Sequence, residues 1–213
     1  MKTESIIFDL DGTLWDSSEN VAVSWTDTIK SCGNSIVRNM TVTGEDIRKV
    51  MGMTMDAIAE KLFPMLSPYH RNELMEKCIA AEQDYLALKG GTLFEGAEKT
   101  LSALAENHRL FIVSNCQCGY IEAFFEYCGL ERLFTDYLCW GETLKPKGET
   151  IKQLMAKNHC TDAVYVGDTQ GDCDAAHAAG IPFIHAAYGF GKITTGDAAA
   201  SVSDICSLTE IFG

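Results

Sequence analysis

Two pairs of aspartates stand where apolar stretches of the sequence end. Asp9 and Asp11 directly follow one apolar run, and Asp168 and Asp172 follow another. Carboxylates this close in a chain repel one another unless a positive charge lies between them. Oxygen ligands of this kind suit Mg²⁺, which typically takes one or two carboxylates, several waters and a substrate phosphate. The four aspartates therefore predict a magnesium site.

Groups that suit an anion follow two further apolar runs. Ser114 and Asn115 end one of them, and Lys145 and Lys147 lie in the loop after the next. A hydroxyl, a lysine and nearby backbone N–H groups are suited to bind an anion beside the metal. Such positive groups offset the charge of phosphate oxygens, so that a carboxylate can approach phosphorus. The combination predicts phosphoryl chemistry.

The elements that must position these residues alternate along the second half of the chain. Segments with apolar residues at helical spacing separate the apolar runs, which indicates a parallel sheet with helices on both sides. The carboxyl ends of parallel strands meet at one edge of a sheet, where ligands bind. Strands are expected at residues 5–9, 108–115, 136–140, 163–168 and 181–188, and helices at residues 96–107, 117–129, 148–158 and 170–180.

Residues 16–90 contain no convincing strand and have the pattern of four helices, at residues 19–31, 44–51, 55–63 and 68–88. The predicted fold class is therefore α/β, with a three-layer, Rossmann-like parallel-sheet core (residues 1–15 and 91–213) and an inserted α-helical cap (residues 16–90). Gly90 and Gly91 are candidates for a hinge. Six of the eight methionines lie between Met40 and Met75. Packing in a small helical core explains them, and an adaptable apolar lining over a site is the alternative.

Composition limits the classes of partner. The 213 residues carry a net charge of −13, the opposite of what a protein that binds the nucleic-acid backbone normally shows. No apolar run approaches membrane-spanning length, and the N-terminus lacks a signal-peptide pattern. The nine cysteines are irregularly spaced, which predicts free thiols in a reducing cytoplasm rather than a zinc site. We expect a cytoplasmic protein without nucleic-acid or membrane partners.

Three common ligand-binding motifs are absent. An EF-hand beginning at Asp9 fails at Thr13, Leu14 and Asn20, where the loop needs an acidic or amide side chain, a glycine and a glutamate. The Gly-x-Gly of YGFGKIT is followed by Thr194 where a dinucleotide fingerprint has its third glycine. No P-loop pattern is present. The acidic cluster is thus not part of any of these sites.

Four short motifs together resemble the haloacid dehalogenase-like (HAD) hydrolases over essentially the whole chain. These are DLDGT, VSN, the lysine segment and VGDTQGD, in the order and spacing of that family and each placed after a strand. The stretch GDTQGDCDAAHAAGIPFI and the helical insertion also resemble the phosphoglycolate-phosphatase-like branch. Members of the superfamily that are dehalogenases lack the second aspartate and transport ATPases have threonine there, so Asp11 indicates a phosphatase or a phosphomutase.

The resemblance implies a role for each acidic residue. Asp9 would be the nucleophile that forms an aspartyl-phosphate. Asp11 would protonate the leaving alcohol and then deprotonate the attacking water. Mg²⁺ would be held by Asp9, the backbone carbonyl of Asp11 and Asp168, with Asp172 acting mostly through water. The carboxylates of Asp9 and Asp11 would tolerate this proximity, because Asp9 would face the metal and phosphorus while Asp11 would face the leaving group.

The same resemblance implies that Ser114 and the backbone of Asn115 bind phosphate oxygens and that a lysine neutralises Asp9 and the phosphate. Lys145 precedes a proline, as in the commoner family pattern, whereas Lys147 precedes Gly-Glu and the start of a helix. A cation at a helix N-terminus is disfavoured, and a bound anion there would offset the penalty. We therefore favour Lys147.

The motifs say little about the substrate. Arg48 and Lys49, in a segment that faces the site in related phosphatases, are candidates to bind a substrate carboxylate or a second phosphate, and a solvated helix face is the alternative. Phosphonate hydrolases of the superfamily form a Schiff base with a cap lysine, but the residues around Lys49 do not resemble that branch. The leading hypothesis is a Mg²⁺-dependent phosphatase of small phosphorylated metabolites such as phosphoglycolate, acting as a monomer or weak homodimer. A β-phosphoglucomutase-like sugar phosphomutase and a non-enzymatic regulatory protein are the alternatives.

Overall fold

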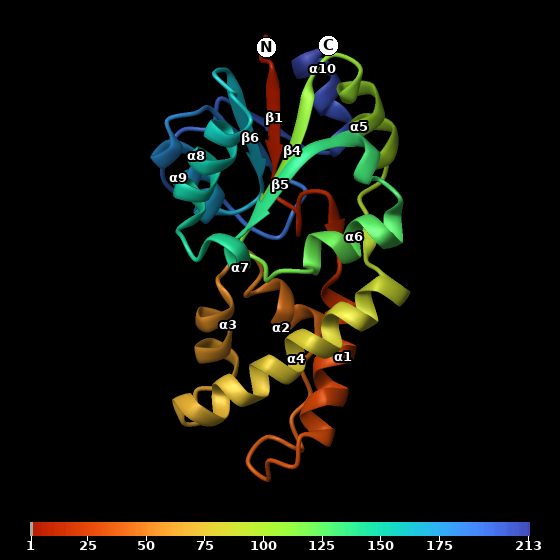
Figure 1. Cartoon of the computed structure of the whole chain (residues 1–213), viewed down its shortest axis with the longest axis vertical. Coiled ribbons are helices and arrows are strands. Elements are labelled where there is room, and N and C mark those ends of the chain that lie inside the picture. The colour runs from red at the N-terminus through yellow and green to blue at the C-terminus, as the bar shows by residue number, and fades with distance from the viewer. Residues whose placement is uncertain (1) are drawn as a thin grey trace.

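The computed structural model describes residues 2–213 and is built around one parallel sheet of six strands (Figure 1). The strand order is β5-β4-β1-β6-β7-β8, so β1 lies near the middle and is paired on both sides. Ile6, for example, is in register with Leu110 of β4 and Val164 of β6. The strands are β1 (Ser5–Phe8), β4 (Arg109–Ser114), β5 (Phe134–Cys139), β6 (Ala163–Gly167), β7 (Phe183–Ala186) and β8 (Ala200–Val202).

Helices cover both faces of this sheet. Because successive side chains of a strand point to opposite faces, Ile6 and Phe8 pack in one core and Ile7 packs in the other. The core around Ile7 includes residues of α8 (Lys147–Lys157) and α9 (Gln170–Ala179). The other core is covered by α5 (Ala97–Ala105), α6 (Tyr120–Cys128) and the C-terminal α10 (Leu208–Phe212), on the opposite side in Figure 1. The three-layer α/β architecture predicted from the sequence is confirmed.

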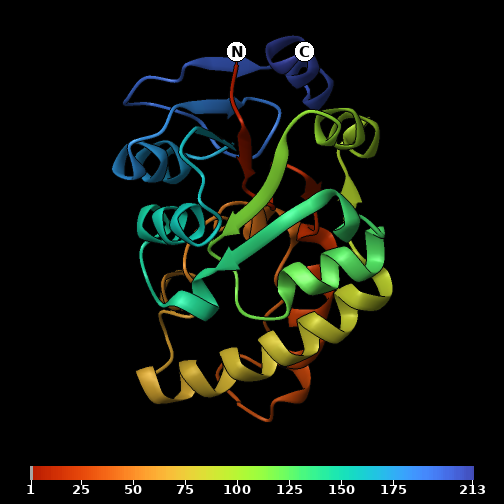
Figure 2. The same cartoon turned by 45° about the horizontal axis from the view of Figure 1, so that its top comes forward.

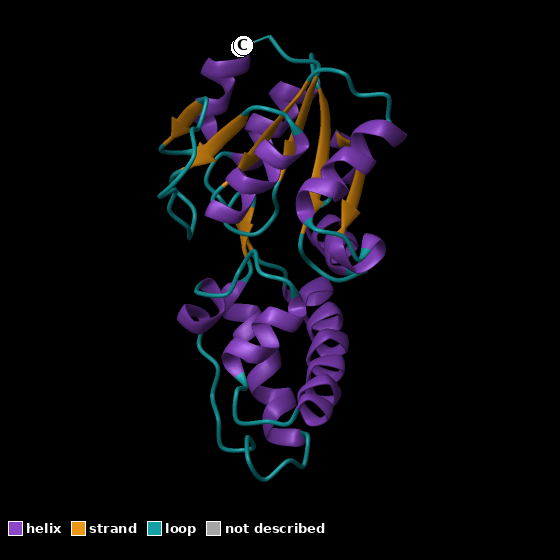
Figure 3. Cartoon of the chain, turned by 90° about the vertical axis from the view of Figure 1, so that its left-hand side faces the viewer, coloured by secondary structure: helices purple, strands orange, loops and turns teal. Residues whose placement is uncertain are grey.

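A helical region lies beyond the carboxyl ends of the strands (Figure 3). The chain enters it through β2 (Trp15–Asp16) and returns through β3 (Thr92–Leu93), and these two short strands pair antiparallel. Helix α4 packs along α1 and also contacts α6, which covers one face of the sheet (Figure 2). The helices are α1 (Ser18–Ser31), α2 (Gly44–Arg48), α3 (Met55–Leu62) and α4 (Pro68–Lys89).

Several short elements were not predicted from the sequence. The edge strand β8 has only three residues and includes an exposed serine, and β2 and β3 have two residues each, so none shows a periodic pattern. The same holds for the four-residue α7 (Trp140–Thr143) and the 3-10 turns η1 (Glu131–Leu133) and η2 (Ile205–Ser207). Within residues 2–213, no helix has the length and apolar character needed to cross a bilayer.

Candidate active site

The loop after β1 brings the first aspartates to the carboxyl edge of the sheet. The backbone N–H of Asp9 donates to the carbonyl of Val166 at 2.8 Å, which extends the pairing with β6 by one residue. The chain then turns at Gly12, whose φ is +78°. A Cβ at this position would lie 2.5 Å from a carboxylate oxygen of Asp168. A glycine is therefore required for the close approach between this loop and the loop after β6.

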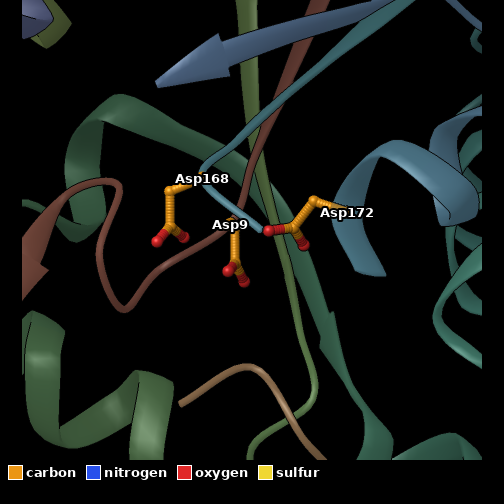
Figure 4. A group of neighbouring side chains, drawn as sticks. All are labelled: Asp9, Asp168 and Asp172. Atoms are coloured by element: carbon orange, nitrogen blue, oxygen red, sulfur yellow. The ribbon is translucent and has the colours of Figure 1, made fainter. Parts of the chain in front are cut away.

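Three carboxylates converge at this edge (Figure 4). Asp9, Asp168 and Asp172 each offer one oxygen, and these oxygens all lie within 4.8 Å of one another. All three side chains are buried. Burial, followed by the charge of Asp172, raises the pKa of Asp9 well above its usual value and that of Asp168 to about 7. Three carboxyl groups held this way require positive charge nearby in order to be ionised.

Two of the carboxylate oxygens have no hydrogen-bond partner among the described residues. They are Oδ2 of Asp9 and Oδ1 of Asp168, and both are buried. A buried polar atom without a partner is costly. Carboxylate oxygens gathered in this way are the donors that a hard divalent cation such as Mg²⁺ prefers. The residues therefore fit the metal that the sequence predicts.

Lys147 supplies one positive charge. Its ammonium lies 3.0 Å from Asp9 Oδ1 and 2.6 Å from Asp172 Oδ1, and its side chain is only 4% exposed. Burial alone would lower the pKa of Lys147, but the carboxylates of Asp172 and Asp9 raise it well above its usual value. Lys145, the other candidate, is exposed and donates to the side-chain oxygen of Gln153 at 2.8 Å. Of the two lysines, the structure places Lys147 in the cluster.

Backbone groups hold Asp168 in position. The N–H groups of Phe190 and Gly191 donate to Asp168 Oδ2 at 2.7 and 3.0 Å. These two residues belong to the Gly-x-Gly segment that matches no dinucleotide fingerprint. Both contacts go to one oxygen, and Oδ1 of the same carboxylate has no hydrogen-bond partner in the part of the chain that the structure describes. The segment therefore orients Asp168.

Asp172 is fixed by the cap of its own helix. The side chain of Thr169 accepts a hydrogen bond from the N–H of Asp172, and Asp172 Oδ2 accepts from the N–H and hydroxyl of Thr169 at 2.9 and 2.7 Å. This reciprocal pattern is a capping box, which satisfies backbone N–H groups at the start of a helix. It uses one oxygen of Asp172 and directs the other to Lys147.

Asp11 has different surroundings. Its Oδ1 accepts hydrogen bonds from Trp15 Nε1 at 3.0 Å, from the Ser17 hydroxyl at 3.0 Å and from the Tyr120 hydroxyl at 2.8 Å. Burial raises the pKa of Asp11 to about 6, and the hydrogen bond from Tyr120 opposes this shift. A carboxyl group with such a pKa exchanges its proton near neutral pH, which is the property that proton transfer in catalysis requires.

A pocket with an empty volume of about 480 Å³ opens beside the carboxylates. Asp9 and Asp11 line one end, together with Ser114 and Asn115 from the end of β4. The Asn115 side chain also donates to the carbonyl of Gly52 at 2.8 Å, which links this edge of the sheet to the helical region. The pocket is thus lined by both the sheet edge and the helical region.

Arg48 and Lys49 do not reach this pocket. The Arg48 guanidinium lies 3.0 Å from carboxylate oxygens of both Asp16 and Glu19, and Lys49 pairs with Glu45 at 2.7 Å. The reason is the spacing of this segment: residues three and four apart share a face, and Ile47, Val50 and Met51 are the ones that line the pocket. The two basic residues lie on the other side, so the expectation that they meet the substrate finds no support in the geometry.

Sequence reasoning missed the residues that surround Asp11. Trp15 and Ser17 follow it closely, so their side chains were available as a local signal. Tyr120 and Glu82, which both line the pocket, come from distant helices, and no local pattern marks them. The sequence admits two explanations for the methionines, packing in a helical core or an apolar lining over a site. Met51, Met53 and Met55 do line the pocket.

Comparison with known proteins agrees with this geometry. Residues 6–186 match the family described as "Haloacid dehalogenase-like hydrolase". A protein from Colwellia psychrerythraea named "Phosphoglycolate phosphatase" is 26% identical over 197 residues, which cover 88% of this chain and 85% of that protein. A protein of the same name from Xylella fastidiosa is 29% identical over 202 residues, which cover 87% of this chain and 81% of the relative.

A solved structure shows the same fold. The crystal structure of a predicted phosphoglycolate phosphatase from Haemophilus somnus superposes with a TM-score of 0.84 at 22% identity. The superposition covers 99% of this chain and 98% of the other.

Proposed function

The chain belongs to the haloacid dehalogenase-like hydrolases, and on that basis we propose that it is a Mg²⁺-dependent phosphatase of small phosphomonoesters. One observation carries the proposal. Buried oxygens of Asp9 and Asp168 lack hydrogen-bond partners within residues 2–213, next to the ammonium of Lys147 and at the end of a pocket. A carboxylate, a cation site and a lysine in this arrangement suit attack on a phosphoryl group.

In the first half of the reaction, a carboxylate oxygen of Asp9 forms a bond to phosphorus as the bond to the leaving alcohol oxygen breaks. Asp11 gives its proton to that oxygen, which leaves as the neutral alcohol. In the second half, Asp11 removes a proton from water, and the water oxygen attacks the aspartyl-phosphate. Inorganic phosphate leaves and the Asp9 carboxylate is restored. The hydrogen bonds to Asp11 from Trp15, Ser17 and Tyr120 hold the carboxyl group in place for both transfers.

Asp9, Asp168, Asp172 and the backbone carbonyl of Asp11 are the groups that would hold Mg²⁺. When bound, the ion supplies positive charge that stabilises the transferring phosphoryl oxygens. Lys147 adds a second positive charge, which opposes the rise in the pKa of Asp9. The Ser114 hydroxyl and the backbone N–H of Asn115 would bind the remaining phosphoryl oxygens, because both are hydrogen-bond donors that suit an anion.

We further propose that residues 16–90 form a cap domain over a core made of residues 1–15 and 91–213. The β2–β3 pair and the Gly90–Gly91 segment would be the hinge. The bond from Asn115 to the Gly52 carbonyl supports a closed position of such a cap. Because the helical region covers the pocket, the expected substrate is a small phosphorylated metabolite and not a phosphoprotein. The free state of all nine cysteines supports a reducing, cytoplasmic location, and a monomer or weak homodimer suffices because the site is built from one chain.

The test is phosphate release from a panel of small phosphate esters with Mg²⁺ and with chelator. Phosphoglycolate, the substrate in the relatives' names, and sugar phosphates belong in the panel. Turnover that requires Mg²⁺ and is lost in Asp9→Asn supports the proposal. A phosphoenzyme that hydrolyses slowly and turns over only with a sugar bisphosphate would indicate a phosphomutase instead. No phosphoenzyme and no turnover with any ester would reject both.

A further inference from the structure

Apart from the acidic residues and the residues that follow β4, the pocket is lined mostly by apolar side chains. Here the helical region contributes aliphatic, thioether and indole side chains. A leaving alcohol whose phosphoryl group is at Asp9 would occupy this pocket and contact the wall that these side chains form. The wall includes Val21, Trp25, Ile47, Met51, Met53 and Ile58.

Glu82 is the acidic residue of this wall. It belongs to α4 and is only 3% exposed. Its Oε1 accepts a hydrogen bond from Gln117 Nε2 at 2.9 Å, and its Oε2 accepts from Trp25 Nε1. Glu82 has no part in the proposed mechanism, although burying a carboxyl group costs free energy of folding. These hydrogen bonds fix the carboxyl group of a residue that lines the pocket.

No basic side chain balances Glu82 among the described residues that line the pocket. Lys147, the cation of the carboxylate cluster, is already paired with Asp9 and Asp172. Arg48 and Lys49 are paired with acids outside the pocket. An anionic group on the leaving alcohol would therefore be desolvated without a counter-charge, and above pH 7, where Glu82 is ionised, it would also lie near a second negative charge. Both effects oppose its binding.

We propose that this pocket selects phosphomonoesters whose leaving alcohol is a short alkyl or alkylammonium chain and rejects those that carry a carboxylate, with Glu82 as the specificity-determining residue. The inference rests on the proposed phosphatase activity and narrows its substrate class. It also separates this chain from relatives named for phosphoglycolate, whose leaving group is anionic. The thioethers of Met51 and Met53 and the indole of Trp25 contact the alkyl part, and Glu82 faces an ammonium group where the substrate has one.

The experiment compares kcat/KM at pH 8, where Glu82 is ionised, for three esters of similar size with Mg²⁺: propyl phosphate, 2-aminoethyl phosphate and phosphoglycolate. The wild type is expected to prefer the first two over phosphoglycolate by about tenfold or more. In Glu82→Gln, the ratio of phosphoglycolate to 2-aminoethyl phosphate is expected to rise by about tenfold or more. Glu76→Gln removes the same charge from an exposed position of α4 and is expected to leave the ratio unchanged.

A second variant keeps the test decisive if Glu82→Gln does not fold. Met53→Lys places a cation in the wall and is expected to raise the relative kcat/KM for phosphoglycolate. A wild type that prefers phosphoglycolate, or variants that change all three esters equally, would overturn the inference. Failure of the proposed function looks different: none of the three esters, nor p-nitrophenyl phosphate, would be hydrolysed.

Discussion

The ammonium of Lys147 lies 2.6 Å from a carboxylate oxygen of Asp172, and both groups are in the first turns of neighbouring helices. A helix N-terminus disfavours a cation by typically 0.3–1 kcal/mol. Asp172, together with Asp9 at 3.0 Å, offsets this penalty for Lys147. The lysine is thus held in place before any substrate arrives, and its charge is available to the phosphoryl group without rearrangement.

Lys147→Ala is expected to lower kcat/KM by about 10²–10³-fold, because it removes a positive charge aimed at the transferring group. Lys145→Ala is the matched control, since Lys145 is exposed and contacts Gln153. It is expected to cost about 1 kcal/mol or less in transition-state stabilisation. Steady-state kinetics with one alkyl phosphate, plus a melting curve for each variant, checks this. The reverse order of the two losses would show that Lys145 is the functional lysine.

Asp9→Asn is expected to reduce turnover to near background while the protein stays folded, because the amide cannot attack phosphorus. The wild type, quenched during turnover and treated with borohydride, should carry its label on Asp9 alone. Mass spectrometry of the peptide that contains residues 5–14 detects it. A label on a serine or histidine would contradict the aspartyl-phosphate mechanism.

Asp11→Asn is expected to lose about 10²–10⁴-fold in turnover of an alkyl phosphate, which is the typical contribution of a general acid–base group. The loss should be smaller with p-nitrophenyl phosphate, because p-nitrophenolate leaves with little help from a proton. Comparing the two substrates in the same variant removes effects on folding or metal affinity. Equal losses with both substrates would argue against proton transfer by Asp11.

The fold and the site differ in how far the sequence predicts them. Each strand carries its own apolar pattern, and the position just after it is fixed by the chain, so Asp9, Ser114 and Asp168 could be placed at one edge of the sheet. Lys147 could be preferred because the helix start is visible in the sequence. Tyr120 lies 109 residues from Asp11, to which its hydroxyl donates. Nothing local marks a contact of that kind.

The positions of the basic residues also could not be predicted from the sequence. Arg48 looks like an anion-binding residue in the sequence, but its partners Asp16 and Glu19 are 32 and 29 residues away. The direction of a side chain on a short helix depends on which face its neighbours bury. Here Ile47 is buried and Arg48 is turned toward the acids. Packing against the neighbouring elements determines the direction of the Arg48 side chain, and a single sequence does not show that packing.

Magnesium is expected to raise the melting temperature of the wild type, because an ion that binds only the folded state stabilises it by about 2.7 kcal/mol at a concentration 100 times its Kd. Asp168→Asn should remove most of this shift, since Oδ1 of Asp168 is one of the buried oxygens without a partner in the described chain. Asp174→Asn removes a charge from the exposed side of α9 and is the control. A shift of equal size in all three proteins would place the ion elsewhere.

The buried carboxyl group of Glu82 is expected to make stability depend on pH. Burial raises its pKa to about 7, against an ordinary value of 4.5, so the folded state favours the neutral form. Below pH 4.5 the group is neutral in both states and costs nothing, whereas above pH 7 it must be ionised while buried, and stability falls across that interval. Glu82→Gln has no such charge. The melting temperature of this variant minus that of the wild type should therefore be larger at pH 8 than at pH 5. The exposed Glu76→Gln should show no such change. A difference between Glu82→Gln and the wild type that is the same at both pH values would mean that Glu82 is not neutral in the folded protein below pH 7.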